Sequence, residues 1–388
     1  MQKKFIAAII VLVALIFIFN TFSAQVIVLE TNEKPVVVWY VIAKWLEPDF
    51  LDIVEKYKPD IILLTLFAED DVVPYHVWHG EQGVRRLVDQ IHERGAKVFF
   101  SYSLFSRAPY DEVAVRNISI EDNIHISDFS RYLKENEKDQ YHRYFDYYLD
   151  HGIDPEKIPK VLRKPVDGYY IPIGHYTVIN PLYEPYRRFL IDVINETLQI
   201  AKPDGLAFDH IRFFTFDEGY NQGIRDYILE KFNFDVYDYT PRPPFILNKT
   251  GWTEDDGIYY DSRAELISNV THDIISKFRG EKFGTTMGMI VPARANGQYA
   301  ELQGRMFDSL LLMAYDKDPA EIERNVRETR EKSGADVILG INKIIGSDED
   351  IVNNIDVGLR SGASGIYLLG YDFSETVHEY LLKVREMA

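Results

Sequence analysis

The chain repeats one pattern eight times: a short apolar run, followed in most repeats by a longer segment with helical spacing of its apolar residues. The apolar runs are Val36–Ile42, Asp60–Phe67, Lys97–Ser103, Asp204–Asp209, Phe283–Val291, Asp308–Tyr315, Asp336–Asn342 and Gly365–Tyr371. Near-continuous apolar runs of this length are typical of parallel strands that are buried on both faces of a sheet. The repeat therefore predicts eight parallel β-strands.

The segments between these runs carry apolar residues at i, i+3 and i+4, which is the pattern of an amphipathic helix. They cover Glu47–Tyr57, Glu81–Gly95, Tyr186–Ala201, Arg263–Phe278, Pro319–Gly334, Ser347–Gly362 and Ser374–Met387, whereas Arg294–Phe307 is short and only weakly helical. Eight alternations of strand and helix predict a (β/α)₈ TIM barrel over residues 36–388. The rival is a doubly wound open sheet, which is less favoured because no Gly-rich phosphate motif follows the first strand.

Two of the predicted connections are long: residues 104–179 follow the third strand and residues 213–257 follow the fourth. Both leave the C-terminal ends of strands, which is the face of a barrel where active sites lie. Structureless loops of this size are uncommon unless they are functional. We therefore expect the two insertions to fold over this face as a lid or as the wall of a cleft.

The N-terminus has the composition of a targeting segment. A basic pair precedes Phe5–Phe19, an unbroken apolar run of 15 residues. This length fits the apolar region of a secretory signal peptide better than a full membrane span. Because apolar residues resume at Val26–Leu29, residues 1–29 are predicted to be either a cleaved signal peptide or an uncleaved membrane anchor formed by residues 5–29. Both alternatives predict an extracytoplasmic protein, secreted or membrane-anchored.

Composition narrows the possible partners. The net charge of -18 opposes nucleic-acid binding, which needs clustered Lys and Arg. The chain has no cysteine, so it forms no disulfide framework and no thiolate metal site. His76 and His79 lie in a predicted loop, and a chance pair is a simpler interpretation than a metal site. We expect no metal and no cofactor, and the oligomeric state stays open.

The fourth run, "DGLAFD", places a carboxylate at each end of a strand. Strand side chains alternate between the two faces, so Gly205, Ala207 and Asp209 share one face while Leu206 and Phe208 share the other. Small residues facing inward would leave space for a ligand, which predicts Asp209 at the base of a pocket at the C-terminal mouth.

Asp204 begins the same strand at the opposite face, where a role in stability is expected. For Asp209, the alternative interpretation is a carboxylate that only caps a loop.

Further polar residues stand at or near the ends of the predicted strands. The candidates for substrate contact are Tyr102, His210, Arg212, Arg294, Tyr315, Asn342 and Asp372. Glycoside hydrolysis needs two carboxyl groups that face one bond, one as an acid and one as a nucleophile or base. Asp209 and Asp316 are the catalytic candidates, with Glu218 as another possible acid. Arg212 or His210 close to Asp209 would favour the charged form of its carboxylate.

The segment "FDHIRF" (208–213) resembles the "FDYIRFP" hallmark of a glycosyl-hydrolase barrel family. Residues 179–209 are similar to that family's approach to strand 4, and residues 296–317 resemble its Gly-Gln element before a strand that ends in Met-x-Tyr. His210 replaces the usual Tyr and Phe214 the usual Pro. The resemblance covers strands 4 to 6 and implies a glycosidase-like barrel.

A more distant resemblance is to family 18 chitinases. The matching residues are Met313, Tyr315 and Asp316 in the sixth run and Asp204, Gly205 and Asp209 in the fourth. However, Ala207 and Ile211 occupy the positions of an Asp and of the acid Glu, and Leu369 stands where that family has a stacking Trp. This comparison supports Asp209 as the central carboxylate and leaves the second carboxylate open.

Together these patterns predict an exported or membrane-tethered glycoside hydrolase that acts on a poly- or oligosaccharide. One alternative is a non-catalytic carbohydrate-binding barrel at the cell surface, which the absence of the family 18 Glu keeps open. A second is a deacetylase, which would require a metal. The sugar, its linkage and the stereochemical outcome are not specified by the sequence.

Overall fold

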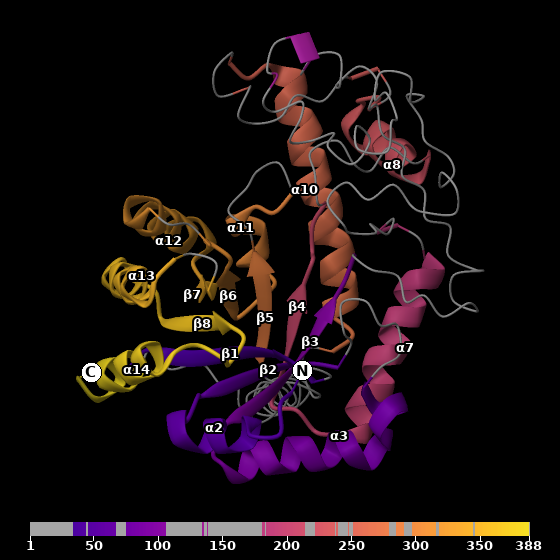
Figure 1. The fold of residues 1–388 in the computed structure, drawn as a ribbon. Helices are drawn as coiled ribbons and strands as arrows, with labels where there is room; N and C mark the ends of the chain where they lie inside the picture. The colour runs from indigo at the N-terminus through magenta and orange to yellow at the C-terminus, as the bar shows by residue number, and fades with distance from the viewer. Residues whose placement is uncertain are drawn as a thin grey trace, which may run out of the picture.

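The computed structural model describes residues 34–43, 46–66, 75–105, 134–135, 138, 181–182, 184–213, 222–236, 238–239, 247, 251–278, 285–290, 297–315, 318–343 and 346–387. Within these residues eight parallel strands form a closed barrel in the order β1 to β8 (Figure 1). The strands are β1 (Val36–Ile42), β2 (Ile61–Thr65), β3 (Lys97–Ser103), β4 (Gly205–Asp209), β5 (Thr285–Ile290), β6 (Ser309–Leu312), β7 (Asp336–Ile341) and β8 (Gly365–Leu369). Each predicted run contains one strand, so the (β/α)₈ prediction is confirmed.

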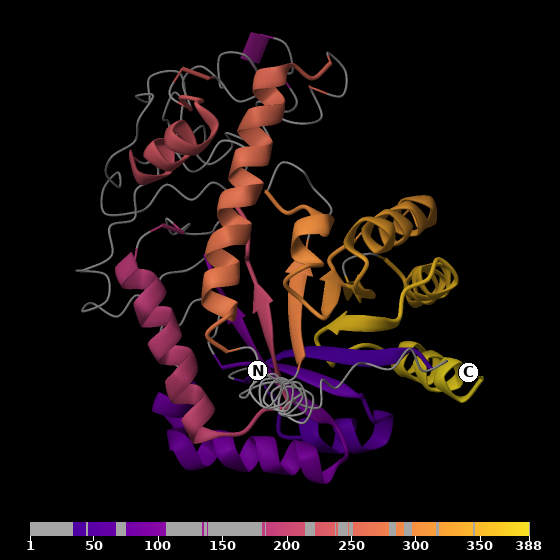
Figure 2. The same ribbon diagram turned by 180° about the vertical axis from the view of Figure 1, so that it is seen from behind.

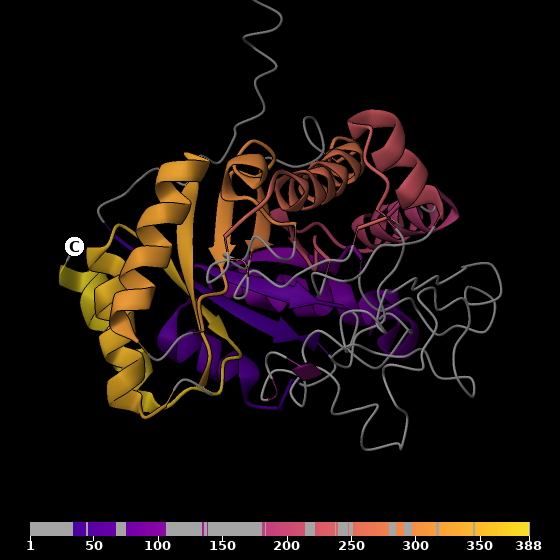
Figure 3. The ribbon, with the colours of Figure 1, turned by 90° about the horizontal axis from the view of Figure 1, so that it is seen from above.

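Helices surround the barrel, with α12 to α14 along one side and α8 and α10 away from them (Figure 3). The described helices are α2 (Phe50–Tyr57), α3 (Tyr75–Glu93), α7 (Glu184–Ile200), α8 (Gln222–Phe232), α10 (Glu254–Ile275), α11 (Ala300–Gln303), α12 (Pro319–Ser333), α13 (Asp348–Arg360) and α14 (Glu375–Met387). The weakly helical link after the fifth strand contains only α11, which has 4 residues.

Two helices begin earlier than their apolar spacing predicts. Helix α10 begins at Glu254 because Thr253 and Asp256 form a capping box, in which each side chain bonds the other residue's main-chain N–H. Helix α3 begins at Tyr75, so the expectation that His76 and His79 lie in a loop is wrong. The first turn of α10, Glu254–Gly257, has no large apolar side chain, so a window of apolar periodicity does not register it.

The described part of the second insertion lies on the expected side of the barrel. Helix α8 and the N-terminal part of α10 stand beyond the arrowheads of β3, β4 and β5 in two opposite views (Figures 1 and 2). Nearly all of the first insertion, residues 104–179, is outside the described residues, as are residues 1–29. Among the helices that the structure describes, none has the length and apolar character that a membrane span requires.

Two hydrophobic layers build the core. The inner layer fills the barrel and consists of Val38, Ile61, Leu63, Phe99, Ala207, Met287, Leu311, Ile338 and Tyr367. The outer layer lies between the strands and the helices and includes Trp39, Leu206 and Phe208. Because side chains alternate along a strand, membership of a layer shows which way each neighbour faces.

Carboxylates at the N-terminal ends of β2, β4 and β6 stabilise the barrel. Asp60, Asp204 and Asp308 stand immediately before β2, β4 and β6. Each accepts a hydrogen bond from the main chain of the preceding strand: from Val37 N at 2.8 Å, from Val98 N at 2.8 Å and from Thr286 N at 2.7 Å. Asp204 also contacts Nε2 of His92 at 2.8 Å. The expectation of a structural role at this face is therefore confirmed for Asp204.

Candidate active site

Asp209 is the last residue of β4 and faces the interior of the barrel. It shares the inward face with Ala207, a member of the inner layer, while Leu206 and Phe208 belong to the outer layer. Its side chain is largely buried, with 8% of the residue exposed. The predicted alternation along this strand is therefore observed, and it places the carboxylate at the C-terminal mouth.

The small residue at the other end of β4 has a different role from the one expected. A Cβ atom at Gly205 would lie 2.5 Å from Cε2 of Phe99. Gly205 therefore makes room for the Phe99 ring inside the barrel and does not leave space for a ligand.

His210 contacts the carboxylate of Asp209 through both its main chain and its ring. Its main-chain N–H donates to Oδ1 of Asp209 at 2.6 Å, and its Nδ1 lies 3.6 Å from Oδ2. Nδ1 is also hydrogen-bonded to Oγ of Ser103, which stands opposite Asp209 in the register of β3 and β4. The backbone of His210 adopts the left-handed conformation, with φ 52°. Such conformations in residues other than Gly are uncommon and are often found at functional sites.

The residues that follow His210 fasten this segment to the outer layer. Ile211 and Phe213 are buried there. The guanidinium of Arg263, from α10, lies 4.1 Å from the centroid of the Phe213 ring. Arg212 lies between Ile211 and Phe213 in the sequence, and its Nε is buried. The sequence expectation allowed either His210 or Arg212 next to Asp209, and the observed contact is with His210.

Tyr40 of β1, Tyr367 of β8 and Tyr315, which follows β6, pack together in the inner layer of the barrel. Tyr367 of β8 is completely buried, and burial raises the pKa of its hydroxyl well above the ordinary value. Tyr315 and Tyr40 are the next contributors to this rise in pKa, and Asp209 adds to it. The rings of Tyr40 and Tyr367 meet edge to face with centroids 6.1 Å apart. The Tyr367 hydroxyl therefore stays protonated inside the barrel.

A glycine on β7 makes room for two of these rings. A Cβ atom at Gly340 would lie 3.0 Å from Cδ1 of Tyr367 and 3.1 Å from Cε1 of Tyr315. Thr65, at the end of β2, adds a further hydroxyl whose Oγ1 is buried and makes no hydrogen bond within the described part of the chain. Among the described residues, the inward side chains near the C-terminal ends of these strands thus carry several hydroxyl groups in addition to the Asp209 carboxylate.

The predicted residues of β7 and β8 lie at the outer rim. Asn342 is half-buried immediately after β7. Asp372 is exposed and forms an ion pair with Lys343, which also follows β7. The chain turns away from the barrel at Gly370, where φ is 109°, and the Tyr371 ring packs on Phe50. Asp372 is therefore further from the barrel interior than Asp209.

Tyr102 does not face the mouth, which corrects the expectation that it contacts substrate. It belongs to the outer layer and is 2% exposed. Its hydroxyl is hydrogen-bonded to Oγ1 of Thr197 on α7. Ser101 and Ser103 occupy the inward positions of β3 on either side of it.

Two predicted site residues, Asp316 and Arg294, lie outside the described residues, and so does Glu218. In contrast, sequence reasoning did not select Tyr40, Thr65, Ser103 or Tyr367. Each shares the inward parity of its strand, and this parity was the signal that could have found them. Among the residues that the structure covers, no group of three or more His, Asp or Glu side chains is placed to hold a metal ion.

No protein-family profile matches the sequence. Solved structures with similar architecture include the catalytic domain of β-amylase from Paenibacillus polymyxa, with a TM-score of 0.56 at 10% identity over 91% of this chain and 97% of that one. The β-galactosidase from the psychrophilic Marinomonas ef1 gives a TM-score of 0.57 at 10% identity, covering 91% of this chain and 59% of that one. The polyextremophilic β-galactosidase of the Antarctic haloarchaeon Halorubrum lacusprofundi gives 0.56 at 9% identity, covering 90% and 57%.

The chain thus spans less than two thirds of either β-galactosidase. At such low identity these similarities concern the fold, and a fold alone does not determine a function. The chain has a closed eight-stranded barrel of the kind that these glycoside hydrolases share.

Proposed function

We propose that this protein is a glycoside hydrolase that cleaves a poly- or oligosaccharide with Asp209 as its central carboxylate. The observation that carries the proposal is the position of Asp209: buried, at the C-terminal end of β4, on the face of the strand that Ala207 shares with the inner layer. Active sites of (β/α)₈ enzymes lie at this end of the barrel. The barrel fold shared with a β-amylase and two β-galactosidases supports the same class of reaction.

The geometry of Asp209 suits a nucleophile or a base. Oδ1 accepts the main-chain N–H of His210, whereas Oδ2 has no hydrogen bond among the described residues. Oδ2 is therefore the oxygen that would attack the anomeric carbon or activate a water. The hydroxyls of Tyr40 and Tyr315 would bind sugar hydroxyls beside it. Arg212, Arg294, Asn342 and Asp372 complete the proposed substrate contacts.

The reaction needs a second carboxyl group to protonate the leaving oxygen. We assign this role to Asp316, because it follows Tyr315 directly and Tyr315 lies at the mouth. Glu218, in the connection after β4, is the other candidate. The separation of the two carboxyl groups would set the outcome: about 5–5.5 Å for retention and about 6.5–9.5 Å for inversion of the anomeric configuration.

The proposal includes export. Residues 1–29 have the basic start and the apolar run of a signal peptide or an N-terminal anchor. A poly- or oligosaccharide substrate outside the cytoplasm is consistent with such a segment. N-terminal sequencing of the protein recovered from its native host would distinguish a cleaved signal peptide from a retained anchor.

A non-catalytic carbohydrate-binding barrel is the second candidate, and one observation favours it. Ile211 occupies the position of the acid Glu of family 18 chitinases, and its side chain is completely buried in the outer layer. That position cannot supply an acid here. If no other carboxyl group takes over the role, the same mouth would bind glycans without cleaving them.

The two candidates differ in turnover. Wild-type protein incubated with a panel of soluble poly- and oligosaccharides should release reducing ends from at least one of them. A hydrolase would show this release at catalytic enzyme concentrations, with each molecule turning over many times. Glycan binding without any released sugar, by protein that is folded by circular dichroism, would support the binding barrel and defeat the hydrolase proposal.

A further inference from the structure

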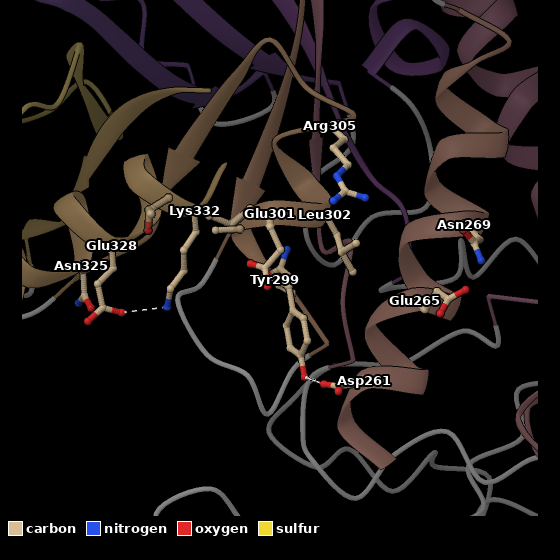
Figure 4. A pocket seen from close by; sticks show the side chains of 14 residues that line it. Asp261, Glu265, Asn269, Tyr299, Glu301, Leu302, Arg305, Asn325, Glu328 and Lys332 are labelled. Carbon is tan, nitrogen blue, oxygen red and sulfur yellow. Dashed lines mark hydrogen bonds and ion pairs between the residues drawn. The ribbon is translucent and has the colours of Figure 1, made fainter. Parts of the chain in front are cut away.

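A second concave site lies on the flank of the barrel, apart from the mouth. It is a cavity of about 950 Å³ between α10, α12 and the short segment that carries α11 (Figure 4). Its lining includes Asp261, Glu265 and Asn269 from α10, Tyr299, Glu301, Leu302 and Arg305 from the α11 segment, and Asn325, Glu328 and Lys332 from α12. This volume is within the range of about 300–1,000 Å³ that is typical of small-molecule sites.

The cavity follows from the unequal lengths of the helices. Helix α11 has 4 residues, whereas α10 and α12 on either side have 22 and 15. A helix rises about 1.5 Å per residue, so α11 covers only about 6 Å of the barrel wall. The ring of helices is therefore incomplete beside β5, and α10 and α12 form the two walls of the gap.

This cavity is separate from the site of Asp209. Ile290, the last residue of β5, lines it and belongs to the outer layer, on the side of the sheet that faces the helices. Asp209 faces the opposite side of the sheet, inside the barrel. A ligand in the cavity would not contact the Asp209 carboxylate.

The segment between the two walls is held at both ends. Near its start, Gly297 has φ 70° and packs against α10, where a Cβ atom would be in ordinary van der Waals contact with the Ala264 main chain at 3.5 Å. Near its end, a Cβ atom at Gly304 would overlap the main-chain oxygen of Ser333, at the end of α12. Between them the Tyr299 hydroxyl donates to Oδ1 of Asp261 at 2.6 Å. The contacts of the α11 segment with α10 and with α12 therefore define the shape of the cavity.

The polar groups in the cavity are of several kinds. Figure 4 shows Asn325, Glu328 and Lys332 on one side, Glu265 and Asn269 on the other, and Glu301 and Arg305 between them. Within the part of the chain that the structure describes, Glu301, Arg305 and Asn325 make no hydrogen bond or ion pair with other side chains. Carboxylates accept, a guanidinium donates and an amide does both, so these groups can bind a ligand without breaking existing contacts.

Two classes of ligand are disfavoured. The lining has four carboxylates, on Asp261, Glu265, Glu301 and Glu328, and two cations, on Arg305 and Lys332. Glu265 is paired with Lys231 and Glu328 with Lys332, so the net charge stays negative, which disfavours an anion. The residues with described positions contain no group of three or more His, Asp or Glu that could hold a metal ion, which disfavours a cation site of that kind. A neutral molecule rich in hydroxyls fits best, since each hydroxyl both donates and accepts. Leu302, Ile290 and the Tyr299 ring supply apolar surface for its carbon–hydrogen faces.

We propose that the cavity between α10, α11 and α12 binds a neutral oligosaccharide chain, as a glycan site distinct from the mouth of the barrel. The proposal goes beyond the proposed hydrolase activity, because binding here needs neither Asp209 nor turnover. In a protein that acts on a long polysaccharide, such a site would keep the chain attached while the mouth engages another part of it.

The test measures binding in the Asp209→Asn background, so that no substrate is consumed. The probes are soluble starch, β-1,4-galactan, barley β-glucan and chitohexaose, with polygalacturonate as an anionic comparison, and the readout is affinity electrophoresis or calorimetry. The test variant is Glu301→Ala with Arg305→Ala, which leaves the net charge unchanged. The matched control is Glu323→Ala with Arg327→Ala, an exposed ion pair on α12 that does not line the cavity.

We expect at least one neutral probe to bind about tenfold more weakly to the test variant, and the control to stay within about twofold of the parent. Asn325→Ala gives a single-residue check that should weaken binding in the same direction. Equal affinity of parent and test variant, preference for polygalacturonate, or no binding of any neutral probe would overturn the proposal. None of these outcomes depends on hydrolysis, so failure of the cavity proposal and failure of the hydrolase proposal remain distinguishable.

Discussion

The main-chain N–H of His210 donates a hydrogen bond of 2.6 Å to Oδ1 of Asp209, the residue directly before it. His210 itself adopts the left-handed conformation, with φ 52°. The bond fixes Oδ1, whereas Oδ2 accepts no hydrogen bond from the residues that the structure describes. The orientation of Asp209 therefore depends on the backbone of its neighbour as well as on the barrel.

Substitutions at His210 should separate its backbone role from its ring. Gly and Asn tolerate the left-handed conformation, whereas a β-branched residue does not. We expect the free energy of unfolding of His210→Val to be about 1–3 kcal/mol lower than that of His210→Gly. Chemical denaturation of the two variants measures this difference. Equal stabilities would show that the conformation of residue 210 carries no strain.

The same pair also reports on catalysis. His210→Gly tolerates the left-handed backbone and loses only the ring, whereas His210→Val strains the backbone next to Asp209. The kcat of His210→Gly should therefore exceed that of His210→Val in any glycoside assay that the wild type supports. A kcat for His210→Gly as low as that of His210→Val would contradict a backbone role and would assign the effect to the imidazole.

Tyr102→Phe should affect stability and not substrate affinity. The Tyr102 hydroxyl bonds Oγ1 of Thr197 in the outer layer, away from the mouth. Loss of one buried hydrogen bond should lower the free energy of unfolding by about 0.5–1.5 kcal/mol. Urea denaturation and steady-state kinetics are the two measurements. A raised KM with unchanged stability would restore Tyr102 as a substrate contact.

Gly205→Ala should destabilise the barrel through overpacking. The new methyl group would lie 2.5 Å from the Phe99 ring, and overpacking in a core costs about 1–3 kcal/mol. Gly257→Ala is the matched control, since Gly257 lies in α10 and a Cβ atom there meets nothing within 4 Å. That change should stabilise by about 0.5–1 kcal/mol, because Ala is the better helix former. Thermal denaturation should therefore show shifts of opposite sign.

His378 should make the protein less stable in acid. It is 2% exposed, its Nε2 donates to the main-chain oxygen of Tyr371 at 3.0 Å, and its ring stacks on Tyr57. Burial lowers the pKa of His378 below its ordinary value of 6.5, and the positive charges of Lys56 and Lys343 add to this, while Asp372 opposes it.

The direction of the pH effect on stability follows from the protonation of His378 in the folded and in the unfolded chain. Above pH 6.5 the imidazole is neutral in both the folded and the unfolded chain, so it contributes nothing to the pH dependence. As the pH falls below 6.5, the unfolded chain binds a proton that the folded chain does not, and stability decreases until the folded pKa is reached. His378→Gln should lose less stability than the wild type between about pH 8 and pH 5. Parallel curves for the two proteins would contradict this assignment.

The eight strands could be predicted from the sequence because both faces of each are buried, which produces long apolar runs. The direction of a side chain was predictable only where the two faces differ in size. In β4, Gly205 and Ala207 alternate with Leu206 and Phe208, and the predicted parity is correct. In β3, Phe99 faces inward and Phe100 outward, so size does not mark the face, and Tyr102 was assigned to the wrong side.

Other features of the site depend on the three-dimensional structure. The ring that fills the space at Gly205 comes from β3, which is far away in the sequence. The left-handed backbone of His210 is not encoded by a glycine, and Tyr40, Tyr315 and Tyr367 meet only when the barrel closes. The flank cavity exists because α11 is short. The weak periodicity of Arg294–Phe307 predicted a short helix, but it did not predict a cavity beside it.

The most direct test of the central claim compares two Asp→Asn variants of the same strand. Asp209 lies at the C-terminal mouth, and Asp204 lies at the opposite end, bonded to Val98 N and His92. Rates of reducing-sugar release are measured for both variants on a glycan that the wild type cleaves, with folding checked by circular dichroism. We expect Asp209→Asn to lose about 10³-fold or more in kcat, because the amide can act neither as nucleophile nor as base. Asp204→Asn should stay within about twofold of the wild type at a temperature where it is folded. A folded Asp209→Asn protein that retains wild-type turnover would contradict the assignment of Asp209 as the central carboxylate.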